Sequence, residues 1–212
     1  MKLRNWILAL GVIAVAGSLV LAQTPVRKPA SPAGTAATQV GGKYVDVQGN
    51  QRYQDGKWIE VNYYRPIKRG RANLFGAGAD YGKAVSDGSP VWRAGANQTT
   101  RLKTEVPLIF DGKTLPVGEY SVFVELKEKA WTLIFSTWPA QEKYDTNNKA
   151  ALWGSYGYTP DKDVLRAPMK VETASFSMDE FLIAFVDMTI DSGTLMMMWD
   201  KTTATAPFTV GK

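Results

Sequence analysis

The 212-residue chain contains no histidine and no cysteine. Without histidine there is no imidazole to act as a general base, to complete a Ser-His-Asp triad or to ligate zinc or copper. Without cysteine there is no thiolate nucleophile, no thiolate metal site and no disulfide. Any catalysis would rest on Asp, Glu, Lys, Tyr, Ser or Thr, and we expect neither a metal site nor a cofactor.

A strong excess of positive charge is also missing from most of the chain. The whole sequence has 25 basic and 20 acidic residues, but without Lys2, Arg4, Arg27 and Lys28 the balance is 21 to 20. A nearly neutral domain lacks the sustained positive surface that nucleic-acid binding requires. We therefore expect no nucleic-acid partner.

The N-terminus has the pattern of an export signal. Lys2 and Arg4 precede an apolar run from Trp6 to Leu21, and Ala22 follows it. We predict a signal peptide over residues 1–22, cleaved after Ala22, and an exported periplasmic or extracellular protein. The alternative is that this segment stays uncleaved as the chain's sole membrane contact, although the run is short for a bilayer span.

The next segment, residues 23–42, is rich in Ala, Pro, Thr and Gly and has no acidic residue. This composition predicts a flexible linker. Aromatic residues become frequent from Lys43 onward, so we place a single domain over residues 43–212. Because it has no disulfide, that domain must be stabilised by its hydrophobic core, and its length is sufficient for one.

Apolar and polar residues alternate with period two through this domain, as in half-buried strands. The alternation is clearest in Leu102–Leu108, Tyr120–Leu126 and Trp131–Phe135. Turn dipeptides such as Asp55-Gly56 and Asp111-Gly112 recur between the runs. The pattern predicts an all-β fold, an antiparallel β-sandwich with long loops and little helix.

Further strands are expected in the C-terminal third, over Val164–Val171, Phe181–Met188 and Thr194–Trp199. Pro207–Val210 reads as an edge strand, because proline is tolerated there. Ser177–Phe181 is ambiguous between a helical turn and the approach to a strand, and we favour a turn followed by a strand.

The segment Arg69–Thr104 lacks regular periodicity over most of its length and is rich in arginine, glycine and aromatic residues. Such a segment within a regular series of strands is typical of ordered functional loops. Guanidinium groups beside flat aromatic rings suit a small anionic or sugar-like ligand. The ligand-binding candidates are Arg69, Arg71, Tyr81, Lys83, Trp92, Arg93, Asn97, Tyr156, Tyr158, Asp163 and Arg166.

Structural interpretations of the same residues stay open. Asn97 can supply a left-handed turn before the strand that begins near Arg101. Met196–Met198 offer thioethers to Cu(I), but consecutive strand residues point to opposite faces, so we interpret them as core-filling. The arginines, above all Arg166, can instead fix loops by pairing with acidic residues such as Asp80, Asp87, Asp161 or Asp163.

Several runs, in order along the chain, resemble a bacterial family known as domain of unknown function 2911. They cover roughly Val61–Val210. The resemblance implies an exported bacterial protein with a mostly β fold, and it implies no reaction. This chain departs from shorter members at Ala84–Pro90 and in an extra hairpin over Tyr44–Ile59. The runs are KRGRANLFG, YGK, VWRAGANQTTRLKT, DGKTLPVGEYSVFVEL, WTLIFS, WGSYGYTPDKDVLR and GTLMMMWDKTTATAPFTV.

Three classes of function follow from these features. We favour a non-catalytic binding or interaction module for a small polar or anionic ligand or an envelope glycan, with its site in the loops Arg69–Asn97. The alternative is a hydrolase or isomerase with Asp163 or Glu119 as base, Lys83 as acid and arginines as clamps. The third is a structural protein that pairs through an edge strand at Thr205–Val210.

Overall fold

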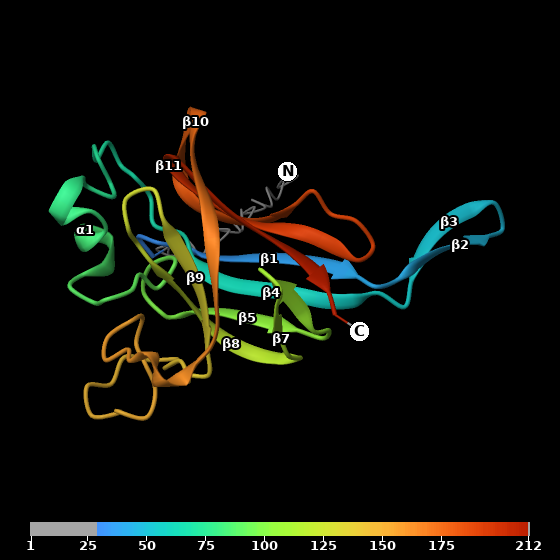
Figure 1. Cartoon of the computed structure of the whole chain (residues 1–212), viewed down its shortest axis with the longest axis horizontal. Coiled ribbons are helices and arrows are strands. Elements are labelled where there is room, and N and C mark those ends of the chain that lie inside the picture. Colours follow the sequence, from blue (N-terminus) through green and yellow to red (C-terminus); the bar gives the residue numbers. More distant parts are fainter. Residues whose placement is uncertain (1–28, 212) are drawn as a thin grey trace, which may run out of the picture.

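The computed structural model describes residues 29–211 (Figure 1). The predicted signal peptide and the beginning of the predicted linker lie outside these residues. The strands are β1 (Ala33–Val40), β2 (Lys43–Val47), β3 (Asn50–Gln54), β4 (Lys57–Tyr64), β5 (Thr100–Thr104), β6 (Leu108–Phe110), β7 (Lys113–Leu115), β8 (Gly118–Glu125), β9 (Trp131–Ser136), β10 (Asp163–Val186) and β11 (Ser192–Val210).

Helices in this part of the chain are short: the 3₁₀ turns η1 (Gly78–Asp80) and η2 (Pro160–Lys162), and α1 (Lys83–Ser86). Between residues 29 and 211, no helix has the length and apolar character needed to cross a membrane. The expected scarcity of helix is therefore confirmed.

Nine strands form one antiparallel sheet in the order β1-β4-β5-β8-β9-β10-β11-β6-β7, and β2 and β3 form a separate hairpin that extends from one end of the molecule (Figure 1). The long strand β10 pairs with β9 through its first part and with β11 through the rest. The rings of Phe110 on β6 and Phe135 on β9 are 5.0 Å apart, although two strands separate β6 from β9 in the sheet. The sheet thus folds over on itself, and the predicted antiparallel all-β fold is confirmed.

Strict alternation on the central strands divides the apolar side chains between two faces. Val122 and Val124 of β8 belong to the main core between the two layers, whereas Phe123 points to the outer face. There it forms a second cluster with Val91, Ile134, Leu152 and Tyr158. Loop residues from 137 to 162 therefore cover part of the outer face, and the candidate site lies beside them.

Strand β1 lies inside the segment that the composition assigned to a flexible linker. It pairs with β4 along its whole length, from Ala33 opposite Tyr64 to Val40 opposite Lys57. Small residues have little intrinsic strand preference, but an extended neighbour offers a full set of backbone hydrogen bonds. The linker prediction therefore does not hold for Ala33–Val40, and the ordered fold begins before Lys43.

Two predictions for the C-terminal third were wrong. Ser177–Phe181 forms no turn, because it continues β10, with shifts of register between Thr173 and Leu182. Pro207–Val210 is not an edge strand, because it is the end of β11, which lies between β10 and β6 in the order of the sheet. The edges of the nine-stranded sheet are β1 and β7. The extra hairpin near Tyr44 is present as β2 and β3.

Candidate functional site

The centre of the candidate site is a short extended segment, Val91–Arg93, that joins the sheet beside β8. The backbone N–H of Trp92 donates to the carbonyl of Val124, and the N–H of Val124 donates to that of Trp92, both at 2.8 Å. Because side chains alternate in an extended chain, Trp92 points into the main core while Val91 and Arg93 point to the outer face. The loop that carries Gly154 and Tyr156 covers Arg93, which is only 8% exposed.

The Arg93 guanidinium has polar and aromatic partners but no acidic one among residues 29–211. Its Nη1 donates to the main-chain carbonyl of Asn97 at 2.9 Å, and its Cζ atom lies 4.9 Å from the centre of the Tyr156 ring. Gly154, with φ of +62°, permits this placement, since a Cβ there would overlap the guanidinium. A guanidinium carries five N–H donors. Arg93 thus keeps donors that its protein partners do not use.

Arg71 lines the same cavity as Arg93 and has the same kinds of partner, although it is exposed. Its Nε donates to the carbonyl of Lys68 at 3.1 Å and its Nη2 to that of Ile67 at 2.9 Å. Its guanidinium also lies over the ring of Trp199, 5.2 Å from the centroid. Like Arg93, it forms no ion pair with an acidic residue in the described part of the chain.

We call the cavity that these two arginines line the arginine cleft. Its volume is about 290 Å³. The acidic residue in its lining is Asp87, whose carboxylate accepts a hydrogen bond from the Tyr156 hydroxyl. The lining therefore carries two positive charges and one negative charge, and the negative one is engaged by a tyrosine. The residues that form it include Arg71, Asp87, Trp92, Arg93, Asn97, Tyr156 and Trp199.

Three other candidates form a separate network in which every charge is compensated. Arg166 binds Asp163 at 2.8 Å and Glu125 at 2.6 Å, and the Tyr158 hydroxyl donates to Asp163 at 2.6 Å. The Asp163 side chain is 8% exposed. This is the loop-fixing role that the pairing of Arg166 with a nearby carboxylate predicts. We call these four residues, with Lys127 beside Glu125, the closed network.

The closed network changes the ionisation of its members. Burial, and then the hydrogen bond donated to Asp163, raise the pKa of Tyr158 far above its ordinary value. The pKa of Glu125 is lowered, first by the hydrogen bond from Lys127 and then by the charges of Lys127 and Arg166, against the opposing effect of burial. Both shifts favour the protonation states that the network needs, a neutral tyrosine and an ionised glutamate.

The remaining candidates do not join either group. Tyr81 packs against Phe75 and its hydroxyl accepts a hydrogen bond from Trp131 Nε1 at 2.9 Å. Lys83 pairs with Asp80 at an exposed position, and Arg69 donates to the carbonyl of Ala30 at 2.8 Å. Tyr81 is thus a packing residue, and the other two are surface contacts.

The groups assigned to the alternative enzyme are also kept apart. Asp163 pairs with Arg166, Glu119 with Arg101, and Lys83 with Asp80. No cluster of three or more Asp or Glu residues suited to a metal ion occurs within residues 29–211.

Two further interpretations can be compared with the structure. Asn97 adopts φ of +56°, so it supplies the left-handed turn expected before β5. Met197 is part of the main core, as the core-filling interpretation of Met196–Met198 expects.

Sequence reasoning missed Asp87 and Trp199 as lining residues of the cleft, and Gly154 as the residue that makes room for Arg93. Gly154 lies in the run WGSYGY, in which glycine alternates with aromatic residues, and that run was a usable signal for a loop packed closely against another chain segment. Trp199 follows a run of methionines within a strand, where the pattern indicates only a core residue.

The fold and the cleft together define an all-β antiparallel domain that carries an arginine-lined cavity beside the Val91–Arg93 segment. A family model described as a protein of unknown function (DUF2911) matches residues 45–208, and the chain belongs to this family. Neither the search of curated proteins nor the search of solved structures found a match.

Proposed function

We propose that this protein is a non-catalytic binding module for a small anionic ligand, such as a carboxylate, phosphate or sulfate, and that the arginine cleft is its site. The observation that carries the proposal is the environment of Arg93, a buried guanidinium whose partners are one carbonyl and one aromatic ring. The export pattern of the N-terminal sequence supports the further proposal that it acts outside the cytoplasm.

A buried charge without a counter-ion is energetically unfavourable, because the low-dielectric surroundings replace water that would solvate it. An anion that enters the cleft would supply the missing charge and accept hydrogen bonds from the free N–H groups. Hydrogen bonds to charged groups contribute roughly 1.5–3 kcal/mol each. Small inorganic anions should therefore bind weakly, and a ligand with further contacts should bind more tightly.

Two features favour a binding site over another loop-fixing contact. The guanidinium of Arg71 is held by two carbonyls and by the face of Trp199, so its orientation is set before a ligand arrives. The nearby acid, Asp87, is engaged by Tyr156. Groups that are oriented in advance lose little conformational entropy when they bind.

The test is calorimetric titration of the domain with acetate, phosphate and sulfate at low ionic strength. Arg93→Gln and Arg71→Gln should each weaken binding of these anions at least about tenfold, since each removes a charged donor. Arg52→Gln is the matched control, because Arg52 is exposed on the β2–β3 hairpin, at the opposite end of the molecule from α1, whose residues Ala84 and Val85 line the cleft (Figure 1).

The Arg52→Gln control should bind like the parent. If Arg93→Gln and Arg71→Gln both fold and bind all three anions with unchanged affinity, the cleft is not the anion site and the proposal is wrong.

A further inference from the structure

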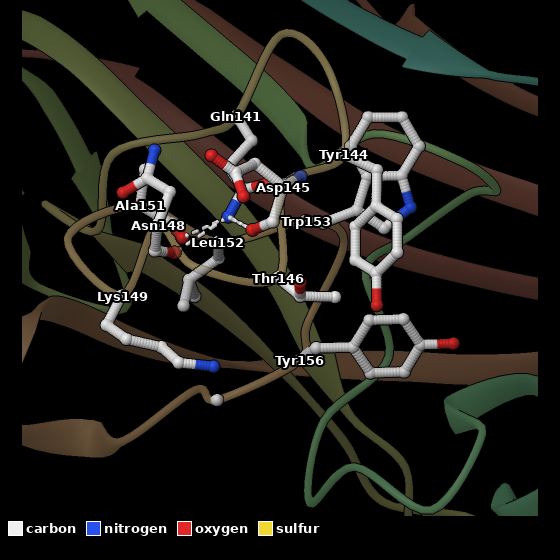
Figure 2. A pocket seen from close by; sticks show the side chains of 11 residues that line it. Gln141, Tyr144, Asp145, Thr146, Asn148, Lys149, Ala151, Leu152, Trp153 and Tyr156 are labelled. Atoms are coloured by element: carbon white, nitrogen blue, oxygen red, sulfur yellow. Dashed lines mark hydrogen bonds between the residues drawn. The ribbon is translucent and has the colours of Figure 1, made fainter.

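A second cavity adjoins the arginine cleft. It has a volume of about 280 Å³ and is built from the loop between β9 and β10. Tyr156 lines this cavity as well as the cleft, so the two share one wall. Figure 2 shows the rings of Tyr144, Trp153 and Tyr156 at one side of the cavity and Asn148, Lys149 and Ala151 at the other. We call it the aromatic pocket.

The loop that forms the aromatic pocket is held in shape by one buried side chain. Gln141 Nε2 donates to the carbonyls of Asn148 and Ala151, both at 2.9 Å, and more weakly to that of Asp145 at 3.2 Å. Its Oε1 accepts the N–H of Asp145 at 2.8 Å. A glutamine that ties together three points of one loop makes the pocket a preformed feature, which lowers the entropic cost of binding.

The aromatic rings of the pocket are unusually accessible. Tyr144 is 55% exposed and Tyr156 is 42% exposed. The rings of Tyr144 and Trp153 pack against each other at 5.8 Å, with an angle of 48° between their planes. Accessible, mutually supported rings of this kind offer flat apolar faces to a ligand, since the negative face of a π-system attracts positively polarised C–H groups.

Polar groups surround these rings. Thr146 and Lys149 line the pocket and make no side-chain hydrogen bond to another group within residues 29–211. Asn148 adds an amide whose oxygen already accepts the N–H of Ala150. Aromatic faces beside free hydroxyl, ammonium and amide groups match a ligand whose rings have an apolar face and a rim of hydroxyls.

The size of the two cavities favours one ligand across both. Ligand pockets usually have volumes of about 300–1,000 Å³. Each cavity alone is slightly smaller than this range, at about 280 and 290 Å³. Because they meet at Tyr156, a ligand of two rings can place one end in each.

We propose that the arginine cleft and the aromatic pocket form one site for an acidic carbohydrate. A carboxylate of the sugar pairs with Arg93 and Arg71, and the neighbouring sugar ring lies against Tyr144 and Trp153. This inference rests on the proposed function, because the half of the site that binds the carboxylate is the arginine cleft. It adds the ligand class, which the anion site alone does not specify.

The test compares three probes by calorimetric titration: digalacturonic acid, its neutral methyl ester and acetate. Digalacturonic acid should bind at least about tenfold more tightly than acetate, and also at least about tenfold more tightly than its ester, because only the acid uses both halves of the site. Tyr144→Ala should weaken binding of the diacid about fivefold and leave acetate unchanged, since it removes an aromatic face and no charge.

Two variants keep this result interpretable. Tyr144→Phe retains the ring and should bind the diacid nearly as well as the parent. Tyr44→Ala is the matched control, because Tyr44 is a 64% exposed tyrosine on the β2–β3 hairpin. Both substituted side chains are accessible, so folding, checked by circular dichroism, should be retained.

The outcomes separate the two proposals. If acetate binds through Arg93 but the diacid binds no more tightly, or Tyr144→Ala leaves the diacid unaffected, the acidic-carbohydrate inference is wrong and the anion site stands. If the acid and the ester bind equally well and the arginine variants have no effect on any probe, the arginine cleft does not bind the carboxylate and both proposals fail.

Discussion

Arg93 and Arg166 project from the same face of the sheet, in the same row, and yet have opposite surroundings. Trp92 pairs with Val124, so Arg93 lies beside Phe123, which pairs with Ile134, which pairs with Arg166. Arg166 meets two carboxylates and a tyrosine hydroxyl, whereas Arg93 meets a carbonyl and a ring. Residue type and position on the sheet therefore do not determine an arginine's role. The acidic residues within its reach do.

The same contrast extends to the tyrosines beside the two arginines. The ring of Tyr158 packs against that of Phe123, with 4.9 Å between centroids, and its hydroxyl donates a hydrogen bond to Asp163 inside the closed network. Tyr156, two residues earlier, remains accessible and lines both the arginine cleft and the aromatic pocket. One loop thus contributes a tyrosine to the closed network and a tyrosine that lines both cavities.

The largest expected effect comes from the glycine that makes room for Arg93. Gly154→Ala should destabilise the domain by about 3 kcal/mol, because it adds the strain of a positive φ to an overlap with the guanidinium. Gly157→Ala is the matched control, with φ of +78° but only an ordinary contact to Leu152 at 3.8 Å. It should cost about 1 kcal/mol. Urea unfolding measures the change in both variants. If both lost the same free energy of unfolding, Gly154 would have no special role in making room for Arg93.

The next effect compares the two arginines directly. Arg166→Gln should lower the free energy of unfolding by about 2 kcal/mol, because it leaves the buried carboxylate of Asp163 without its counter-ion. Arg93→Gln should change stability by less than about 1 kcal/mol, because no carboxylate loses a partner. Paired urea titrations of the two variants check this order. If Arg93→Gln lowered the free energy of unfolding as much as Arg166→Gln, Arg93 would be a structural residue like Arg166, and the difference in role between the two arginines would not hold.

The smallest effect concerns the response to alkaline pH. The folded-state pKa of Tyr158 lies above its ordinary value of 10, so its stabilising contribution is complete below pH 10 and is lost as the pH rises through the folded value. Tyr158→Phe should cost about 1 kcal/mol at pH 7, through loss of the hydrogen bond to Asp163. In this variant the free energy of unfolding should also fall less steeply with pH above pH 10, by the slope that corresponds to one bound proton. Unfolding curves between pH 7 and 11 provide the measurement, and an unchanged alkaline slope would contradict the shift.

Much of the fold could be predicted from local pattern because strands bury alternate side chains. The alternation in Tyr120–Leu126 and Trp131–Phe135 corresponds to β8 and β9, which are central strands of the sheet. Strand β1 could not be predicted this way. Its residues are mostly small, and its place in the sheet depends on hydrogen bonds to β4, whose paired residues lie 17 to 31 positions later in the chain. Partner choice in a sheet is a long-range property that local composition does not encode.

For the site, the sequence by itself determined which chemistry was available: many guanidinium groups and aromatic rings in irregular loops, and no imidazole or thiol. Only the tertiary structure decided which arginines are compensated. Arg166 and Asp163 are three residues apart, but Glu125 comes from β8 and completes their network from across the sheet. Arg93, Arg71 and Tyr156 come from three separate segments that meet only in the folded chain. Charge compensation depends on distances of a few ångströms between such segments, and those distances are set by packing.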